Sequence, residues 1–203
     1  MWSHAYFNNG INYPRTLQRL NNGSFLICGN GQLAASYGFV LRLSSDGDVL
    51  WSKRYNRFLF KAFAELPGGD WVFAATETGP LPQAACVLRM NPAGDIIWAK
   101  RLNMPYALNW LPGLTVTPAG DLVIFNYETQ KEQAVADMIG LSAAGDFQWA
   151  TRYDLCHDYG VSTGIITNDG GIAGLRYRSG GHLFLKTDAQ GHCQNCTATG
   201  VVI

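Results

Sequence analysis

The sequence has 203 residues, of which 47% are hydrophobic and only 15% charged, and its 15 basic residues balance its 15 acidic residues. This balance argues against nucleic acid as a partner, because binding to phosphates needs a basic excess or a basic patch. No apolar stretch is long enough to cross a bilayer, and the N-terminal residues lack the charged and apolar regions of a signal peptide. The localisation is left open, with a surface, secreted or virion-associated protein favoured.

A motif recurs along the chain with a period of about fifty residues. Its three clear copies are Phe39–Tyr55, Cys86–Leu102 and Asp137–Tyr153, and each holds a Gly-Asp turn followed by a tryptophan. The turn glycines, with that of the last repeat, are Gly47, Gly94, Gly145 and Gly191. A second turn precedes each copy, and its glycines are Gly23, Gly69, Gly120 and Gly170. Two series of turns with one period indicate a repeat architecture.

Each repeat is predicted to form four antiparallel strands and no helix. In the second repeat the predicted strands are 61–66, 70–76, 85–90 and 95–102. Tight glycine turns separate the first strand from the second and the third from the fourth, as hairpins require. Four-stranded repeats around an axis are the blades of a β-propeller. The predicted blades span about 13–55, 59–102, 109–153 and 160–187, within a single all-β domain over residues 1–203 that ends in a tail at 192–203.

The last repeat lacks the pattern of its fourth strand. Tryptophans at one position of that strand are predicted to pack between blades, and they are Trp51, Trp98 and Trp149. The last repeat has Asn195 there, whereas Trp2 and Tyr6 repeat the spacing of the tryptophan and tyrosine in the other copies. We therefore expect residues 1–7 to supply the outer strand of the last blade, with Trp2 between blades. This closes a four-bladed monomer and removes an open sheet edge. The alternative is a half-ring that pairs with a second copy to give eight blades.

The repeat resembles bacterial β-propeller repeats of the G-D-x-x-W-x-K-x-Y type, which are quinoprotein-like in style and occur in long secreted and surface proteins. The resemblance covers roughly residues 13–191. Closure with four blades is also reminiscent of hemopexin-type propellers, although their characteristic motifs are absent. The resemblance implies an interaction scaffold rather than an enzyme, and likeness of fold does not transfer a function.

The candidate ligand-binding residues lie on one face of the predicted propeller. The loops between second and third strands share this face with the connections between blades, and these segments are longer than the tight turns of the other face. Loops on a rigid scaffold are common sites of binding, and aromatic, arginine and asparagine side chains suit interfaces and sugars. The predicted residues are Asn8, Asn9, Tyr13, Arg57, Phe58, Tyr106, Trp110, His157, Asp158, Tyr159, Arg178 and His182.

The sequence therefore predicts a non-enzymatic module that binds a protein or a glycan through its loop-rich face, without a cofactor. An alternative is a structural assembly subunit of a surface, secreted or phage-like virion particle. A small hydrolase or lyase that uses His157 and Asp158 is the least favoured hypothesis.

Neither a catalytic group nor a metal site is predicted. The G-x-S-x-G pattern at Gly160–Gly164 falls where an inner strand is expected, whereas a nucleophile elbow needs a strand-to-helix turn. Cys193 and Cys196 form a C-x-x-C pair, and Cys156 with His157 would be needed to complete a weak candidate zinc site. A plain tail or a structural disulfide is the preferred interpretation, and the odd count of five cysteines leaves at least one outside any disulfide within the chain.

Overall fold

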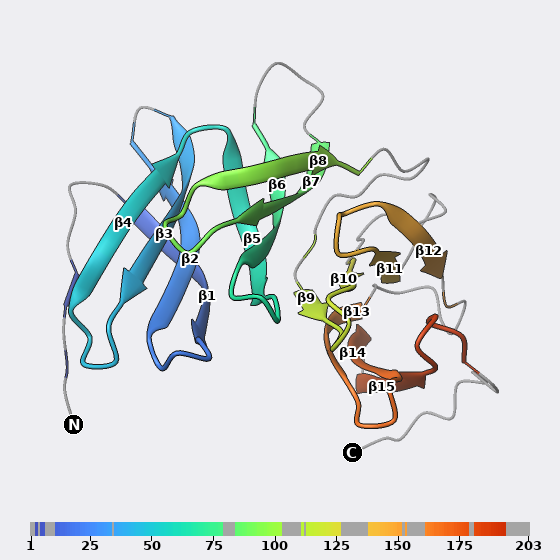
Figure 1. The fold of residues 1–203 in the computed structure, drawn as a ribbon. Helices are drawn as coiled ribbons and strands as arrows, with labels where there is room; N and C mark the ends of the chain where they lie inside the picture. The colour runs from blue at the N-terminus through green and yellow to red at the C-terminus, as the bar shows by residue number, and fades with distance from the viewer. Residues whose placement is uncertain are drawn as a thin grey trace. The chain divides into compact units, whose positions relative to one another are not determined.

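A computed structural model describes residues 3, 5–6, 11–33, 35–78, 84–102, 111, 113–126, 138–151, 153, 161–178 and 181–193. These residues form strands, turns and connections but no helix, which confirms the predicted all-β class (Figure 1). The chain consists of two compact units, Met1–Arg101 and Leu102–Ile203. The prediction that residues 1–203 form a single domain stays a prediction.

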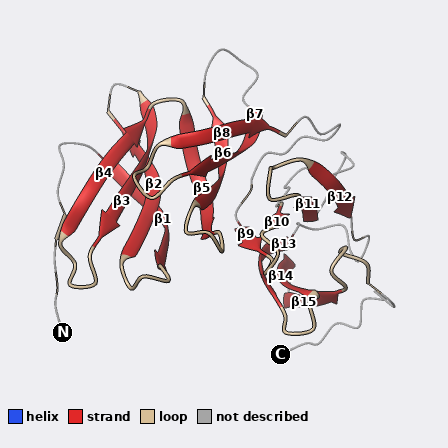
Figure 2. Ribbon diagram, in the orientation of Figure 1, coloured by secondary structure: helices blue, strands red, loops and turns tan. Residues whose placement is uncertain are grey.

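The first unit contains two four-stranded antiparallel sheets, each with its strands in chain order. Sheet one consists of β1 (Ile11–Arg19), β2 (Phe25–Gln32), β3 (Ser36–Leu43) and β4 (Val49–Tyr55). Sheet two consists of β5 (Phe58–Glu65), β6 (Trp71–Glu77), β7 (Ala84–Met90) and β8 (Ile96–Arg101). Figure 2 shows that the described elements of this unit are strands joined by turns. Each sequence repeat in this half of the chain therefore forms one sheet.

The second unit contains one sheet of four strands and one of three. Sheet three consists of β9 (Gly113–Val116), β10 (Leu122–Phe125), β11 (Met138–Leu141) and β12 (Phe147–Thr151). Sheet four consists of β13 (Val161–Ile166), β14 (Ile172–Arg178) and β15 (Gly181–Thr187). Both sheets are antiparallel, with their strands in chain order.

The predicted outer strand of the last blade is not confirmed. In the described part of the chain β15 pairs with β14 alone, and Ser3, Ala5 and Tyr6 belong to no strand. Each described sheet is open, with two edge strands, so a closed ring of four blades is not confirmed either. Pairing of distant segments is decided by tertiary placement, which a match in local spacing does not determine.

The two series of turn glycines adopt the backbone conformation that the repeat predicts. All eight have a positive φ, between 75° and 92°. Only glycine enters this region without a steric cost from its side chain, which explains the recurrence of glycine at these turns. The Asn91 side chain shows how a turn is fixed, because its carboxamide oxygen accepts hydrogen bonds from the backbone N–H groups of Ala93 and Asp95, at 3.0 and 2.9 Å.

A β-bulge recurs in the first strand of three sheets. The register shifts between Pro14 and Thr16 in β1, between Phe60 and Ala62 in β5, and between Val161 and Thr163 in β13. The extra residues are Arg15, Lys61 and Ser162. Bulges re-aim a side chain out of the regular alternation of a strand. One residue of each of these strands therefore lies outside the regular strand pairing. In the first unit both such residues, Arg15 and Lys61, are cationic.

The core of the first unit lies between sheets one and two. Cys28 and Val40 of sheet one are fully buried against apolar side chains of sheet two, including Phe73 and Leu88. Trp51, at the position that the sequence places between repeats, lies 6.0 Å from Trp71 of the next sheet, measured between ring centroids. Burial of large apolar side chains on both facing surfaces is the main force that holds two sheets together.

Sheets three and four share the core of the second unit in the same way. Phe125 and Met138 of sheet three are buried with Ile172 and Leu185 of sheet four. Trp149 packs against this cluster, and its ring also lies beside the turn at Gly191. A Cβ atom on that glycine would stand only 2.8 Å from the Trp149 ring.

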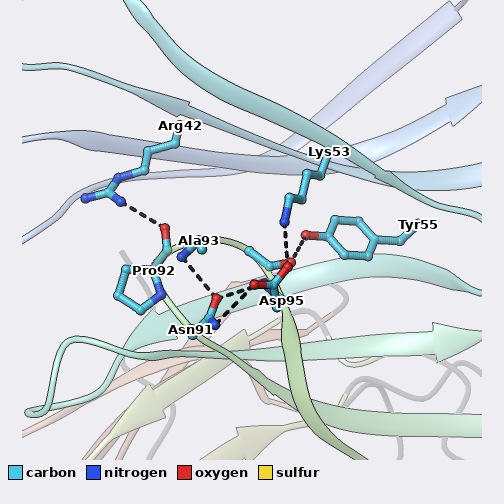
Figure 3. A network of polar contacts seen from close by, with 8 residues as sticks. Arg42, Lys53, Tyr55, Asn91, Pro92, Ala93 and Asp95 are labelled. Atoms are coloured by element: carbon cyan, nitrogen blue, oxygen red, sulfur yellow. Dashed lines mark hydrogen bonds and ion pairs between the residues drawn. The ribbon is translucent and has the colours of Figure 1, made fainter.

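Tyrosine hydroxyls bind the turn of the following sheet. Tyr55 donates to the Gly94 carbonyl at 2.7 Å, and Tyr153 donates to the Gly191 carbonyl at 2.5 Å. Tyr6 donates to the Gly47 carbonyl at 2.6 Å, so the N-terminal segment contacts sheet one as a fourth strand contacts the sheet after it. Around the Gly94 turn, Lys53 also pairs with Asp95 at 2.7 Å and Arg42 donates to the Pro92 carbonyl at 2.9 Å (Figure 3).

We expect Tyr55→Phe and Tyr153→Phe each to lower the free energy of unfolding by about 1 kcal/mol, because each removes one hydrogen bond and leaves a carbonyl without its donor. Urea titration followed by circular dichroism measures the change. Tyr13→Phe is the matched control, because Tyr13 is 52% exposed and should lose almost nothing. Equal losses in all three variants would show that the hydroxyl bonds to the turns contribute nothing specific.

Candidate functional site

A cluster of arginines lies at the end of the first unit where the strands meet their longer connections. In this antiparallel arrangement β4, β6 and β8 end there and β5 begins there. We call this cluster the arginine end and define it by six residues: Tyr37, Arg54, Arg57, Phe58, Glu77 and Arg101. The opposite end of the same sheets carries the tight glycine turns.

Glu77 is the centre of the arginine end. It is the last residue of β6, and only 5% of it is exposed. One carboxylate oxygen accepts a hydrogen bond from Nε of Arg57, and the other accepts one from Nε of Arg101. The two arginine side chains remain 69% and 56% exposed, so the carboxylate holds each guanidinium in place while leaving much of it in contact with solvent.

The three charges stabilise one another. The hydrogen bond from Arg101 is the main cause that lowers the pKa of Glu77, and Arg57 adds to it, whereas burial acts in the opposite direction. The same hydrogen bond raises the pKa of Arg101. At neutral pH both guanidiniums and the carboxylate are therefore charged, and these three groups together have an excess of one positive charge.

A second guanidinium arrangement adjoins the first. Arg54 lies over the ring of Tyr37, with 4.0 Å between the guanidinium carbon and the ring centroid, and its Nε donates to the Asn56 side chain at 2.7 Å. The Tyr37 hydroxyl donates in turn to the Asn12 carboxamide oxygen at 3.1 Å. Stacking on an aromatic ring fixes the plane of a guanidinium. Arg54 thus adds a further oriented cation to this end of the unit.

Two further cations, Arg15 and Lys61, occupy the bulges of β1 and β5. Burial lowers the pKa of Lys61, and the positive charge of Arg15 lowers it further. The Thr16 hydroxyl donates to the Lys61 carbonyl at 3.4 Å, which ties the two bulges together.

The arrangement can bind an anionic group, and it offers little for covalent chemistry. Guanidiniums bind carboxylate, sulfate or phosphate groups through pairs of N–H donors. The thiols of Cys28 and Cys86 are buried, and burial raises the pKa of each to about 12, so neither is a nucleophile at neutral pH. Within the described ranges no group of three metal-ligating side chains is found.

The structure describes only part of the predicted ligand-binding set. Tyr13 is exposed, Arg57 belongs to the arginine end, and Phe58 is 6% exposed and packs in the core beneath Arg57. The backbone of Arg178 ends β14 and that of His182 lies at the start of β15. The other residues of the set lie outside the described residues, and they are Asn8, Asn9, Tyr106, Trp110, His157, Asp158 and Tyr159.

The structure describes only some of the predicted inter-blade tryptophans and only one residue of the weak candidate zinc site. Trp98 is half-buried with Lys100 over its ring, whereas Trp2 lies outside the described residues. Cys193 is bonded in a disulfide, which leaves no thiolate there for a metal. The other members of that candidate site, Cys156, His157 and Cys196, are not described.

Sequence reasoning missed Glu77, Arg101 and Arg54. Two signals were available. Glu77 is an acid at the end of a strand that is otherwise nearly all apolar, and a buried acid is expected to have a charged partner. Arg54 and Arg101 occupy the same position, three residues after the repeated tryptophan.

Comparison with known proteins shows likeness of fold alone. No protein-family model and no curated protein matches the sequence. A mannose phosphorylase from Leishmania mexicana, solved in complex with phosphate ion, resembles the chain with a TM-score of 0.52 and 11% identity over 87% of this chain. A hypothetical protein from Leishmania major gives a TM-score of 0.52 and 13% identity over 86% of this chain. This chain spans 66% of the length of each of those two chains.

A tail fibre of a Staphylococcus aureus phage is a more distant neighbour, with a TM-score of 0.33 and 8% identity over 90% of this chain and 50% of its own. Among the described residues, no helix is long and apolar enough to cross a membrane.

Proposed function

We propose that this chain is a non-enzymatic binding module that recognises an acidic glycan through the arginine end of its first unit. The observation that carries the proposal is the pair Arg57 and Arg101, both largely exposed and both held by one buried carboxylate. A guanidinium fixed before the ligand arrives loses little conformational entropy on binding, which favours affinity. The carboxylate or sulfate groups of an acidic sugar are suitable anions for such a pair.

The proposal also covers the fold that carries the arginine end. We take the four sheets as blades of a β-propeller related to bacterial propeller repeats, because each repeat forms one antiparallel sheet with the same glycine turns. One of the proteins with a similar fold is a mannose phosphorylase, an enzyme that by its name acts on a sugar. That likeness transfers no activity, and the proposal for this chain is binding.

Binding of the wild-type chain to an array of acidic and neutral glycans tests the proposal. We expect signals for glycans that carry carboxylate or sulfate groups, and a decrease of these signals as salt is added, because salt screens exposed charges. Arg57→Gln and Arg101→Gln should each weaken binding by about tenfold, since each removes a charge-assisted hydrogen bond to the anion.

Arg19→Gln is the matched control. It removes one positive charge from an exposed residue at the tight-turn end of the same unit, and it should leave binding unchanged. Equal losses of binding for Arg19→Gln and Arg57→Gln would show that the net charge of the chain, and not the arginine end, determines binding. Absence of binding to every acidic glycan, or binding only to a protein partner, would show that the proposed ligand class is wrong.

A further inference from the structure

Three buried N–H donors lie close together between sheets one and two. Within the described residues, Nε of Arg42, Nε1 of Trp51 and Nε1 of Trp71 are buried atoms that have no hydrogen-bond partner. Arg42 and Trp51 are cross-strand partners in β3 and β4, and the ring centroids of Trp51 and Trp71 are 6.0 Å apart. The guanidinium carbon of Arg42 lies 5.4 Å from the Trp71 ring centroid. We call these three residues the donor cluster.

The donor cluster is unusual in energetic terms. A buried N–H group that loses water without gaining an acceptor destabilises a fold, so native proteins rarely leave one unpaired. Trp71 is only 1% exposed, so bulk water does not satisfy its indole. Three such donors in one place indicate an acceptor that comes from outside the described chain.

Arg42 also has no carboxylate partner among the described residues. Its Nη1 donates to the Pro92 carbonyl at 2.9 Å, which is a neutral acceptor (Figure 3). The remaining residues of the first unit cannot supply a counter-ion, because they include no aspartate and no glutamate. The half-buried charge of Arg42 is therefore uncompensated within its unit.

Two other sheets pair the corresponding cation with an acid. This cation lies five residues before the second turn glycine of its repeat, and it is Arg42 in sheet one, Arg89 in sheet two and Lys186 in sheet four. Arg89 pairs with Asp70 at 2.7 Å, and Lys186 pairs with Asp169 at 2.8 Å. Each of these acids adjoins the first turn glycine of its own repeat.

Sheet one has no acid at either of these positions. The residues that correspond to Asp70 and Asp169 are Ser24 and Asn22. Their side chains bind each other, because the Ser24 hydroxyl donates to the Asn22 carboxamide oxygen at 2.6 Å. Sheet one therefore keeps the cation of the repeat without its carboxylate, and this is the cation that belongs to the donor cluster.

We propose that the donor cluster binds a small inorganic anion, a halide such as chloride, in place of the carboxylate that sheets two and four supply. A halide accepts hydrogen bonds from several directions and compensates the charge of Arg42. Water suits the cluster less well, because it carries no charge and its two lone pairs face three donors. The anion joins two sheets, since Arg42 and Trp51 belong to sheet one and Trp71 to sheet two. The cluster lies at the tight-turn end of the unit, so this site is separate from the arginine end.

Thermal unfolding of the full chain at constant ionic strength tests the proposal. Sodium chloride replaces sodium gluconate stepwise, so that screening of surface charges does not change. We expect the melting temperature to rise by about 2–4 °C with the logarithm of the chloride concentration, because a ligand that binds only the folded state stabilises it.

Three variants assign the effect to the donor cluster. Arg42→Gln should abolish the chloride dependence, because it removes the charge that attracts the anion. Ser24→Asp should abolish it as well and should raise the melting temperature in gluconate, because it restores the carboxylate that Asp70 supplies in sheet two. Arg89→Gln is the matched control, since it removes the same charge from a cation that has its own acid, and it should keep the full chloride dependence.

A crystal soaked in sodium bromide locates the site directly. We expect an anomalous-scattering peak for bromide among Arg42, Trp51 and Trp71. Absence of a peak there would mean that water is the acceptor and would overturn the proposal. A melting temperature that chloride leaves unchanged, or one that rises equally in the wild type and in Arg42→Gln, would overturn it too, even beside a bromide peak, because binding would then occur at crystal concentration only.

Discussion

Gly94→Ala is expected to lower the free energy of unfolding of the first unit by about 3 kcal/mol. Two costs combine at this position. The backbone has a φ of +80°, which is strained for any residue with a Cβ atom, and the added Cβ would stand 2.8 Å from the Trp51 ring. Because Trp51 packs against Trp71 of the next sheet, the ring cannot move without opening the contact between the two sheets.

Gly69→Ala separates the two costs. Gly69 has a φ of +85°, but a Cβ atom added to it would meet nothing within 4 Å. Its substitution should cost about 1 kcal/mol, which is the backbone contribution alone. Urea titration of both variants with tryptophan fluorescence measures the difference. Equal losses would mean that the Trp51 contact adds nothing, and that turn conformation alone explains the glycine.

Glu77→Gln is expected to lower the free energy of unfolding by about 2 kcal/mol at neutral pH, because it weakens two charge-assisted hydrogen bonds. The loss should depend on pH in a defined direction. The folded state lowers the pKa of Glu77, so its stabilising effect is fully present above the pKa of the unfolded chain, about 4.3. The effect is lost as the pH falls through the lower, folded pKa. The difference between wild type and variant should therefore shrink in acid.

The control for Glu77 is the same substitution in an Arg57→Gln, Arg101→Gln background. Without the two guanidiniums, burial alone raises the pKa of Glu77, so Glu77→Gln should no longer destabilise the fold at neutral pH, and its dependence on pH should reverse in sign. Stability measured by urea titration from neutral pH to about pH 3 covers the titration of an ordinary glutamate. A loss that stays constant over this range would contradict the proposed ion pairs.

The sheets and turns could be predicted from the sequence because their causes are local. A turn that needs a positive φ requires glycine, so Gly47 and Gly94 indicate two hairpins directly. The alternation of apolar residues then defines strands on either side, and the repeat carries the pattern through the chain. The all-β class depends only on these local signals.

The candidate site and the missing strand depend on distant contacts. Arg57 and Arg101 are separated by more than forty positions in the sequence, and only the pairing of β5, β6, β7 and β8 brings both to Glu77. The partner of the open β15 edge is a similar case. Tyr6 shares the spacing of the tyrosines that end fourth strands, and its hydroxyl likewise binds a turn carbonyl, but Tyr6 belongs to no described strand, and spacing does not determine strand pairing.

The buried thiols between the first two sheets have a consequence for chemical durability. Burial raises the pKa of Cys28 and of Cys86 to about 12, so both remain thiols at neutral pH. Oxidants and disulfides react with the thiolate, so these two residues stay reduced while sheets one and two remain packed. Cys193, by contrast, is already oxidised. The chain can therefore carry a disulfide in one unit and unreactive thiols in the other. In an oxidising environment, Cys28 and Cys86 would exchange with that disulfide only after the first unit unfolds.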